Sequence, residues 1–147
     1  MKKFLMCNCG ETFKDLAPFA LRLAVGLVFF VHGYQKLTVF KTEGVTQMLQ
    51  GLGFPAPEIF AVILIAVELV GGAALVLGFF THWAAKLTGI VALVALILVH
   101  LPNGFWLADN GYEFMLLILA ATISLAVTGG GRWSLDHLFL KSGESSM

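Results

Sequence analysis

The chain has 147 residues, of which 59% are hydrophobic and 12% charged. With glycine counted and tyrosine left out, the apolar share is roughly 69%, against about 45–50% in soluble domains, so a soluble globular domain is excluded. Nine basic against nine acidic residues, without a basic block, exclude a nucleic-acid partner, and two cysteines exclude a disulfide scaffold, which leaves a small polytopic membrane protein.

Four apolar segments follow in chain order, each close to the roughly 20 helical residues that cross a hydrocarbon core of about 30 Å. They are residues 16–36, 59–80, 83–101 and 112–128, the last of them short for a full crossing. In the first outer loop, Val45, Met48, Leu49 and Leu52 have helical spacing, which predicts a short interfacial helix over 43–52. The predicted fold is therefore all-α: a four-helix transmembrane bundle over residues 16–136 with a short interfacial helix.

The distribution of basic residues predicts the orientation of the bundle. Four crossings place both termini on one side, and that side collects Lys2, Lys3, Lys14, Arg132 and Lys141, with Lys86 just inside the third span. The opposite side has Lys36 and Lys41. By the positive-inside bias, the tails 1–15 and 137–147 are expected in the cytoplasm.

Polar residues inside the spans are the candidates for a functional site, because ionisable groups in a membrane face the bundle interior or water. The candidates are Arg22, His32, Lys36, Glu68, His100, Asn103 and Glu113. A helical wheel predicts one polar stripe on each span. The stripes are Arg22, Gly26, Phe29, His32, Gly33 and Lys36; Glu68, Gly71, Gly72 and Leu75; Lys86, Gly89, Leu93, Ile97 and His100; and Glu113, Leu117, Ala120 and Ser124.

Depth within the membrane predicts which candidates meet. Glu68 lies near the bilayer middle and Arg22 only about 5–6 Å away in depth, so the two are expected to form an ion pair. The other candidates lie near the outer ends of their helices. If the stripes converge, they form a polar pocket that opens outward, with the Arg22–Glu68 pair as its floor.

A structural alternative stays open for each of these residues. Lys36, Lys86 and Glu113 are close enough to helix ends to snorkel. The Arg22–Glu68 pair could be a clasp between helices, and the histidines hydrogen-bonded helix ends; the glycines beside the charges are expected to be close-packing positions. Cys7 and Cys9 form a C-x-C that cannot complete a tetrahedral zinc site alone, and no metal site is predicted.

Several sequence segments resemble the DoxX family of small four-helix bacterial inner-membrane proteins. These are LRLAVGLVFFVHGYQKL, GLGFPAP, VELVGGAALVLGFFTHWAA, HLPNGF, GYE and GGGRWSLD, in this order over residues 16–136. The family's conserved polar positions match Arg22, His32, Gly33, Lys36, Glu68 and Glu113. The resemblance implies association with quinone-linked oxidation, thiol redox stress or quinone resistance, but no established catalytic residues.

The leading hypothesis is a redox-associated subunit, with a bound quinone or a similar amphipathic molecule in the pocket. Lys36 or a histidine would stabilise a carbonyl that gains electrons. Since the sequence has no flavin or haem motif, electrons would come from a partner protein, and a homo-oligomer is the other partner expected besides the lipid bilayer. Whether the chain is itself an enzyme, such as the membrane subunit of a quinone-linked oxidoreductase, stays open. The alternatives are a small proton-coupled transporter and a non-catalytic membrane scaffold.

Overall fold

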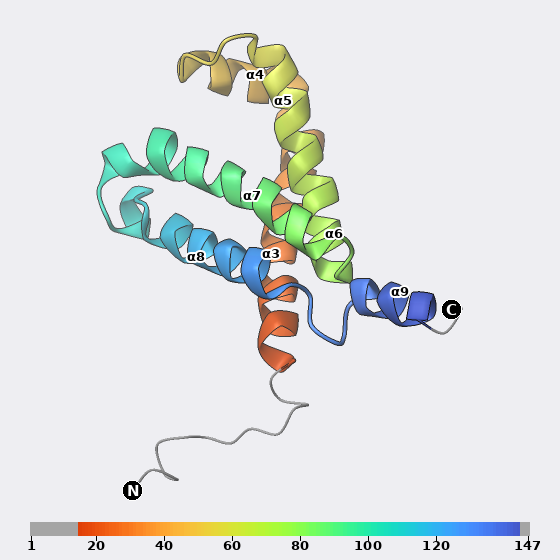
Figure 1. The fold of residues 1–147 in the computed structure, drawn as a ribbon. Coiled ribbons are helices and arrows are strands. Elements are labelled where there is room, and N and C mark those ends of the chain that lie inside the picture. The colour runs from red at the N-terminus through yellow and green to blue at the C-terminus, as the bar shows by residue number, and fades with distance from the viewer. Residues whose placement is uncertain (1–14, 145–147) are drawn as a thin grey trace, which may run out of the picture.

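The computed structural model describes residues 15–144, with side chains described through residue 139, and this part of the chain is helical without a strand (Figure 1). The main helices are α3 (Leu16–Gln35), α4 (Lys41–Gly51), α5 (Pro57–Ala66), α6 (Gly72–Leu77), α7 (Thr81–Ala95), α8 (Glu113–Thr128) and α9 (Leu135–Glu144). Single π-helical turns continue three of them: η1 (Lys36–Phe40), η2 (Val67–Gly71) and η3 (Leu96–His100). Short 3-10 turns η4 (Leu101–Asn103) and η5 (Leu107–Asp109) form the loop before α8.

The predicted membrane helices are confirmed. Three continuous helices, Leu16–Gly51, Pro57–Leu77 and Thr81–Asn103, are long and apolar enough to cross a membrane, and Glu113–Thr128 is a shorter apolar helix. The predicted short helix is also present as α4, which begins two residues earlier than expected, at Lys41. Lys41 has φ 55°, and this left-handed residue lets α4 turn away from the line of α3.

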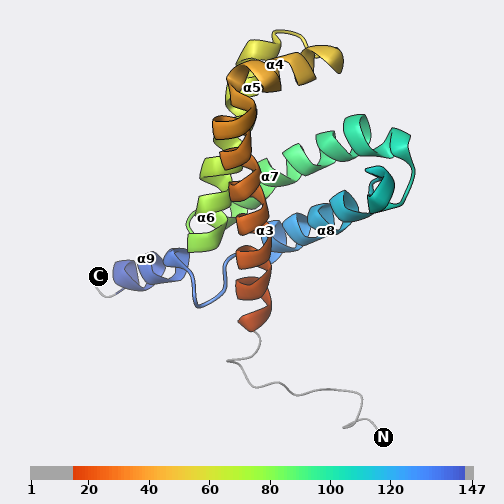
Figure 2. The same ribbon diagram turned by 180° about the vertical axis from the view of Figure 1, so that it is seen from behind.

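The helices form two antiparallel pairs that cross one another. In Figures 1 and 2, α3 runs beside α5 and α6, whereas α7 and α8 form a second hairpin that crosses the first pair at a steep angle. The free tip of the second hairpin lies well away from α4 in both views. The two pairs therefore meet where α6 leads into α7 and diverge toward their outer ends.

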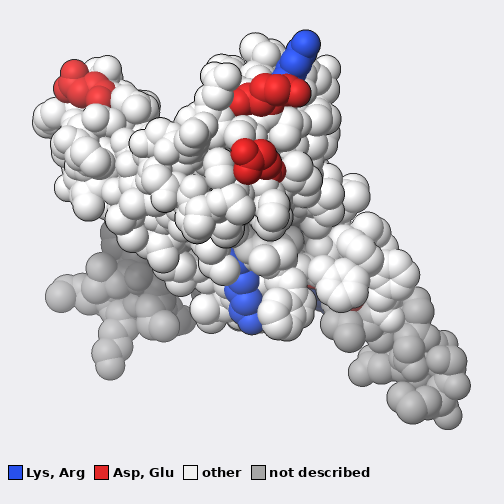
Figure 3. Space-filling model, turned by 90° about the horizontal axis from the view of Figure 1, so that it is seen from above, with Lys and Arg blue, Asp and Glu red and all other residues white. Residues whose placement is uncertain are grey.

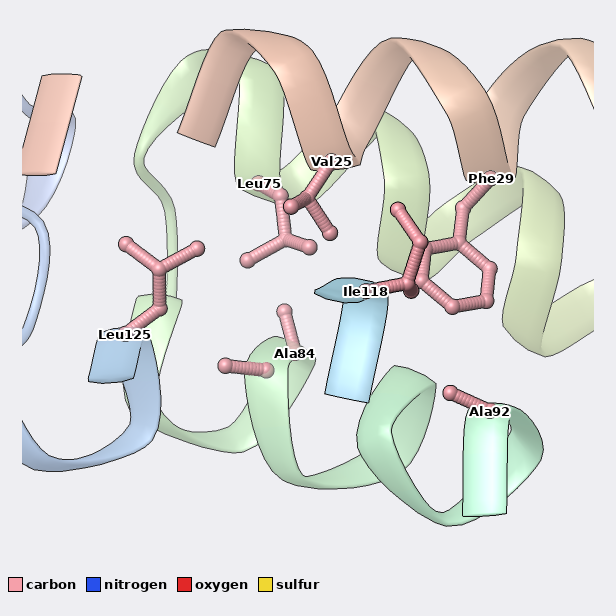
Figure 4. Close-up of a cluster of buried hydrophobic side chains, with 8 residues drawn as sticks. Val25, Phe29, Leu75, Ala84, Ala92, Ile118 and Leu125 are labelled. Atoms are coloured by element: carbon pink, nitrogen blue, oxygen red, sulfur yellow. The ribbon is translucent and has the colours of Figure 1, made fainter. Parts of the chain in front are cut away.

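The core lies at this crossing. Val25 and Phe29 of α3, Leu75 of α6, and Ile118 and Leu125 of α8 point toward one another and toward alanines of α7 (Figure 4). A second, smaller cluster packs Val45 and Leu49 of α4 against Ala61 and Ile65 of α5. Much of the remaining surface is apolar, and the face in Figure 3 shows charged side chains in only a few separate groups. That distribution fits a protein whose solvent is largely lipid.

The start of α3 lies beside the loop after α8, which fits the expectation that the chain crosses the membrane four times. The backbone N–H of Arg132 donates to Asp15 Oδ1 at 3.1 Å, which joins the start of α3 to the loop after α8. Beyond this loop lies α9. The segment expected as the C-terminal tail, 137–147, therefore begins within a helix. Leu135, Leu138 and Phe139 recur at helical spacing, which explains why this segment is helical. Cys7 and Cys9 lie outside the described residues.

Candidate functional site

Lys36 and Glu68 form an ion pair between α3 and the second span. Lys36 Nζ donates to Glu68 Oε1 at 2.9 Å and lies 2.8 Å from Oε2. The Glu68 side chain is 7% exposed and that of Lys36 17%, so the carboxylate is buried while the ammonium reaches the surface. The pair satisfies two charges that would each cost about 2.5–3.5 kcal/mol if left alone in a membrane helix.

Glycine brings the two backbones close enough for this pair. A Cβ on Gly33 would lie 2.8 Å from the Leu69 backbone nitrogen and 2.9 Å from Glu68 Cβ. Lys36 is one helical turn beyond Gly33 on the same face, so its ammonium extends back over Glu68. Gly26 and Gly72 make the same kind of approach lower in the pair, which confirms the expectation that these glycines are close-packing positions.

Three of the candidate ionisable residues lie in the π-helical turns. Lys36 begins η1, Glu68 lies within η2 and His100 ends η3. A π turn inserts one residue into an α-helix and re-aims the side chains around it, and such turns are frequent at functional sites. This irregularity is invisible to a helical wheel, which assumes one constant period.

His32 lies beside the pair but is not part of it. It is on the same face of α3, its residue is exposed, and it is close enough to interact electrostatically with Glu68. Together, Lys36, Glu68 and His32 place a buried acceptor, a half-buried cation and an exposed imidazole within one stretch of the membrane. These groups can donate to and accept from a polar group that approaches from the lipid side.

The predicted Arg22–Glu68 pair is wrong. Arg22 is fully buried, and its guanidinium donates to three backbone carbonyls: Nη1 to Leu75 and Val76 at 3.2 Å each, and Nη2 to Trp133 at 2.6 Å. The first two carbonyls lie in the last turn of α6, where the helix dipole is negative, and that of Leu75 also accepts from the Gly78 N–H at 3.1 Å. Arg22 is therefore held by backbone dipoles in place of a carboxylate.

The pairing failed because the depth estimate was wrong. Gly33, and not Arg22, lies opposite Glu68, and the eleven residues from Arg22 to Gly33 span about 16 Å of helix. That separation is about three times the expected difference in depth. Arg22 lies instead where Gly78, with φ 68°, ends α6 and leaves room for the guanidinium.

His100, Asn103 and Glu113 lie together, but in the tip of the second hairpin, away from Lys36. His100 Nδ1 is 2.9 Å from the Asn110 carbonyl, so Nδ1 carries the proton of this bond. Asn103 Nδ2 donates to the carbonyls of Val99 and Asn110, and Glu113 Oε1 accepts from the Leu107 N–H at 2.7 Å. Every one of these bonds stays within residues 99–113, at the tip of the second hairpin.

The predicted polar stripes are largely correct on the first two spans, where His32 is the one exposed member, and wrong on the other two. Arg22, Gly26, Phe29, Gly33, Glu68, Gly71, Gly72 and Leu75 are all buried. On the third and fourth spans, the predicted stripe residues Leu93, Ile97 and Leu117 are 42%, 47% and 68% exposed. The buried faces there carry threonine and small residues, including Thr88, Ala92 and Thr122.

Sequence reasoning missed a hollow at the end where both helix pairs begin. A cavity of about 900 Å³ lies between the start of α7, residues 129–134 and α9. Asp136 closes one side, since its two carboxylate oxygens accept from the N–H groups of Phe80 (2.6 Å) and Thr81 (2.9 Å). The segment GGGRWSLD marked this region, but only as part of the resemblance and not as a site. Among the described residues, no three His, Cys, Asp or Glu side chains lie together as a metal site would need.

Comparison with known proteins places the chain among small bacterial membrane proteins. The family model described as DoxX matches residues 17–101. A Bacillus subtilis (strain 168) protein named "Putative oxidoreductase CatD" is 32% identical over 127 residues, which cover 86% of this chain and 90% of that protein. Two Escherichia coli (strain K12) proteins are also similar: inner membrane protein YphA is 33% identical over 79% of this chain and 85% of its own length, and inner membrane protein YqjF is 31% identical over 87% and 95%. No solved structure matches the chain.

Proposed function

Because the chain belongs to the DoxX family of integral membrane proteins, we propose that it is a redox-associated inner-membrane subunit that binds a quinone or a similar amphipathic molecule. The proposed site is the Lys36–Glu68 pair with the adjacent His32. The observation that carries the proposal is an ion pair inside a membrane helix pair whose cation remains 17% exposed. The similar Bacillus subtilis protein named as an oxidoreductase supports the redox part of the proposal.

Lys36 supplies the chemistry that a quinone carbonyl needs. Its ammonium has three donors, of which one is committed to Glu68 Oε1. A second N–H can donate to a carbonyl oxygen, whose negative charge grows as the ring gains electrons. Full reduction takes up two electrons and two protons and gives the quinol. The electrons come from a partner redox protein, and Glu68 holds Lys36 in place.

The surroundings of the pair suit a ligand that enters sideways from the lipid. Leu37, next to Lys36, is 49% exposed, and Val70, two residues after Glu68, is 70% exposed. A hydrophobic tail can lie along these apolar surfaces while the ring carbonyl reaches the ammonium. The site thus needs no aqueous entrance.

The two ends of the helical part fit a cytoplasmic location for both termini. Asp15 and Arg132 are in contact, which supports an exit of both chain ends on one side of the membrane. The terminal segments and the loop after α8 contain the basic residues Lys2, Lys3, Lys14, Arg132 and Lys141. The positive-inside bias then favours the cytoplasm.

Quinone content after purification tests the proposal. The full chain is extracted from its native membrane in mild detergent, and bound quinone is quantified by chromatography and by its oxidised-minus-reduced difference spectrum. We expect about one quinone per site in the wild type and at least a tenfold loss of affinity in Lys36→Met, since one charge-assisted hydrogen bond contributes about 1.5–3 kcal/mol.

Lys86→Met is the matched control, because Lys86 is an exposed lysine that stacks on Trp83 (4.5 Å from Nζ to the ring centroid) on the other helix pair. It is expected to retain the wild-type quinone content. Thermal melting of each variant separates loss of ligand from loss of fold. A wild-type protein that carries no quinone and binds no added short-chain quinone contradicts the proposal.

A further inference from the structure

The hollow near α9 offers hydrogen-bond donors that have no acceptor among the residues that the structure describes. We define the α7–α9 hollow by Thr81, Trp83, Gly130, Arg132 and Phe139, which line it together with their neighbours. Thr81 is fully buried, and its hydroxyl has no hydrogen-bond partner among the described residues. A buried hydroxyl without a partner costs free energy, which points to a group that is bound there.

The glycine loop adds backbone donors next to this hydroxyl. A Cβ on Gly130 would lie 2.7 Å from Thr81 Oγ1, so only glycine lets the loop come this close to the start of α7. Within residues 15–144, the N–H groups of Gly130 and Gly131 make no hydrogen bond. The N–H groups of Phe80 and Thr81 at the start of α7 already donate to Asp136, so the backbone donors left here are those of the glycine loop.

The two carboxylates that line the hollow, Asp15 and Asp136, are negatively charged, but each already has hydrogen-bond donors of its own. Asp136 accepts from two N–H groups, and Asp15 accepts from the Arg132 N–H and lies 4.0 Å from the Arg132 guanidinium. The Arg132 side chain is nevertheless 58% exposed, so its guanidinium has donors to spare. His82 and His137 also line the hollow.

The rim of the hollow is aromatic and faces outward. Phe80, Trp83 and Phe139 are 60%, 62% and 62% exposed. Aromatic side chains of this kind gather at the level of lipid headgroups, with their apolar parts toward the acyl chains. The helix α9 presents Leu138 and Phe139 at the same level, as an amphipathic interfacial helix does.

We propose that the α7–α9 hollow binds the phosphate group of an anionic phospholipid from the adjoining leaflet. Thr81 Oγ1, the N–H groups of Gly130 and Gly131, and the Arg132 guanidinium hold the phosphate, and the aromatic rim contacts the acyl chains. This site lies at the opposite end of α3 from the Lys36–Glu68 pair and does not depend on the function proposed for that pair.

Native mass spectrometry of the full chain in detergent tests the assignment. The delipidated protein is titrated with phosphatidylglycerol, with phosphatidylcholine and with diacylglycerol, which lacks the phosphate, all with the same acyl chains. We expect phosphatidylglycerol to bind about tenfold more tightly than diacylglycerol, with phosphatidylcholine between them. Arg132→Gln should weaken phosphatidylglycerol binding about tenfold and Thr81→Val about threefold.

Lys86→Gln is the control, because it removes an exposed cation from α7 at the same end of the molecule. Lys86 does not itself line the hollow and contacts its rim through the Trp83 ring. It should change the affinity less than twofold. Thr81→Val removes a hydroxyl without a partner and keeps the volume, so its melting temperature should match that of the wild type and confirm the fold. The proposed site is wrong if the three lipids bind with equal affinity, or if Lys86→Gln weakens phosphatidylglycerol binding as much as Arg132→Gln does. If inorganic phosphate at the same concentration displaces the lipid, the hollow is a site for soluble phosphate, and the proposal of a phospholipid ligand is wrong.

Discussion

The two helix pairs are built on different packing rules. In the pair of α3 with α5–α6, glycines bring backbones into contact, and charged side chains are buried beside them at Arg22 and Glu68. In the pair of α7 with α8, threonines and alanines form the interface, and Thr88 and Thr122 return their hydroxyls to the carbonyls of their own helices. The first pair therefore buries charge, whereas the interface of the second buries the hydroxyls of Thr88 and Thr122, which are already satisfied.

The difference shows what an ionisable residue needs before it turns inward. Glu68 faces the interior because Lys36 and a close backbone approach are available there. Lys86 has no acidic partner among the described residues and lies over the Trp83 ring at the surface. A charged residue in a membrane helix thus marks an interior face only where the opposite helix supplies a partner.

The largest effect should come from the guanidinium in the first pair. Arg22→Met removes a fully buried guanidinium together with its three hydrogen bonds. The carbonyls of Leu75, Val76 and Trp133 then lose the donor that the guanidinium supplies. We expect a loss of about 4 kcal/mol in the free energy of unfolding, measured by reversible denaturation in mixed micelles. Arg132→Met, at an exposed arginine, should cost less than about 0.5 kcal/mol. If Arg132→Met lowers the free energy of unfolding as much as Arg22→Met does, the burial of Arg22 does not account for its contribution to stability.

A smaller but more specific loss is expected from breaking the ion pair. Lys36→Met leaves the Glu68 carboxylate buried without its cation and should cost about 3 kcal/mol. A double-mutant cycle of Lys36→Met with Glu68→Gln should give a coupling of more than 1 kcal/mol, whereas Arg22→Met with Glu68→Gln should be additive to within about 0.5 kcal/mol. Strong coupling between Arg22 and Glu68 would revive the pairing that the structure contradicts.

Glycine packing should distinguish the two pairs more modestly. A Cβ on Gly72 would lie 2.5 Å from the Phe30 backbone nitrogen, so Gly72→Ala forces the helices apart and should cost about 2 kcal/mol. A Cβ on Gly89 in α7 would contact only the Thr122 side chain, with its hydroxyl oxygen at 3.1 Å, so Gly89→Ala should cost less than about 1 kcal/mol. Thermal melting in one detergent compares the two variants directly, and equal shifts would remove the distinction between the pairs.

Sequence reasoning succeeded where hydrophobicity or paired features decide the structure. The spans follow from apolar length, and the buried face of the first pair follows because glycines and charges recur together on one face, as at Gly33 and Glu68. It failed for the second pair because Thr88 and Thr122 carry no charge and were not counted as polar markers. Lys86 and Glu113 were counted, although the first stays at the surface and the second bonds within its loop.

Two features lay beyond any pattern of side chains. The partners of Arg22 are backbone carbonyls, which every residue has and no sequence singles out. The steep crossing of the two pairs is likewise absent from a helical wheel, which gives the face of a helix but not its angle to another (Figure 1). For these reasons the sequence predicted one outward pocket, whereas the structure has two separate polar groups, one around Lys36 and one around His100.

The smallest effect should come from the tip of the second hairpin, and it tests whether the two polar groups act separately. Glu113→Ala removes one acceptor, from the Leu107 N–H, in a loop with further backbone hydrogen bonds, so the cost should be about 1 kcal/mol. Quinone content, measured as for Lys36→Met, should stay at the wild-type level, because no bond of Glu113 leaves the loop. If Glu113→Ala instead removes the quinone without lowering the melting temperature, the tip and the Lys36–Glu68 pair share one ligand, and the two helix pairs must close on each other when it binds.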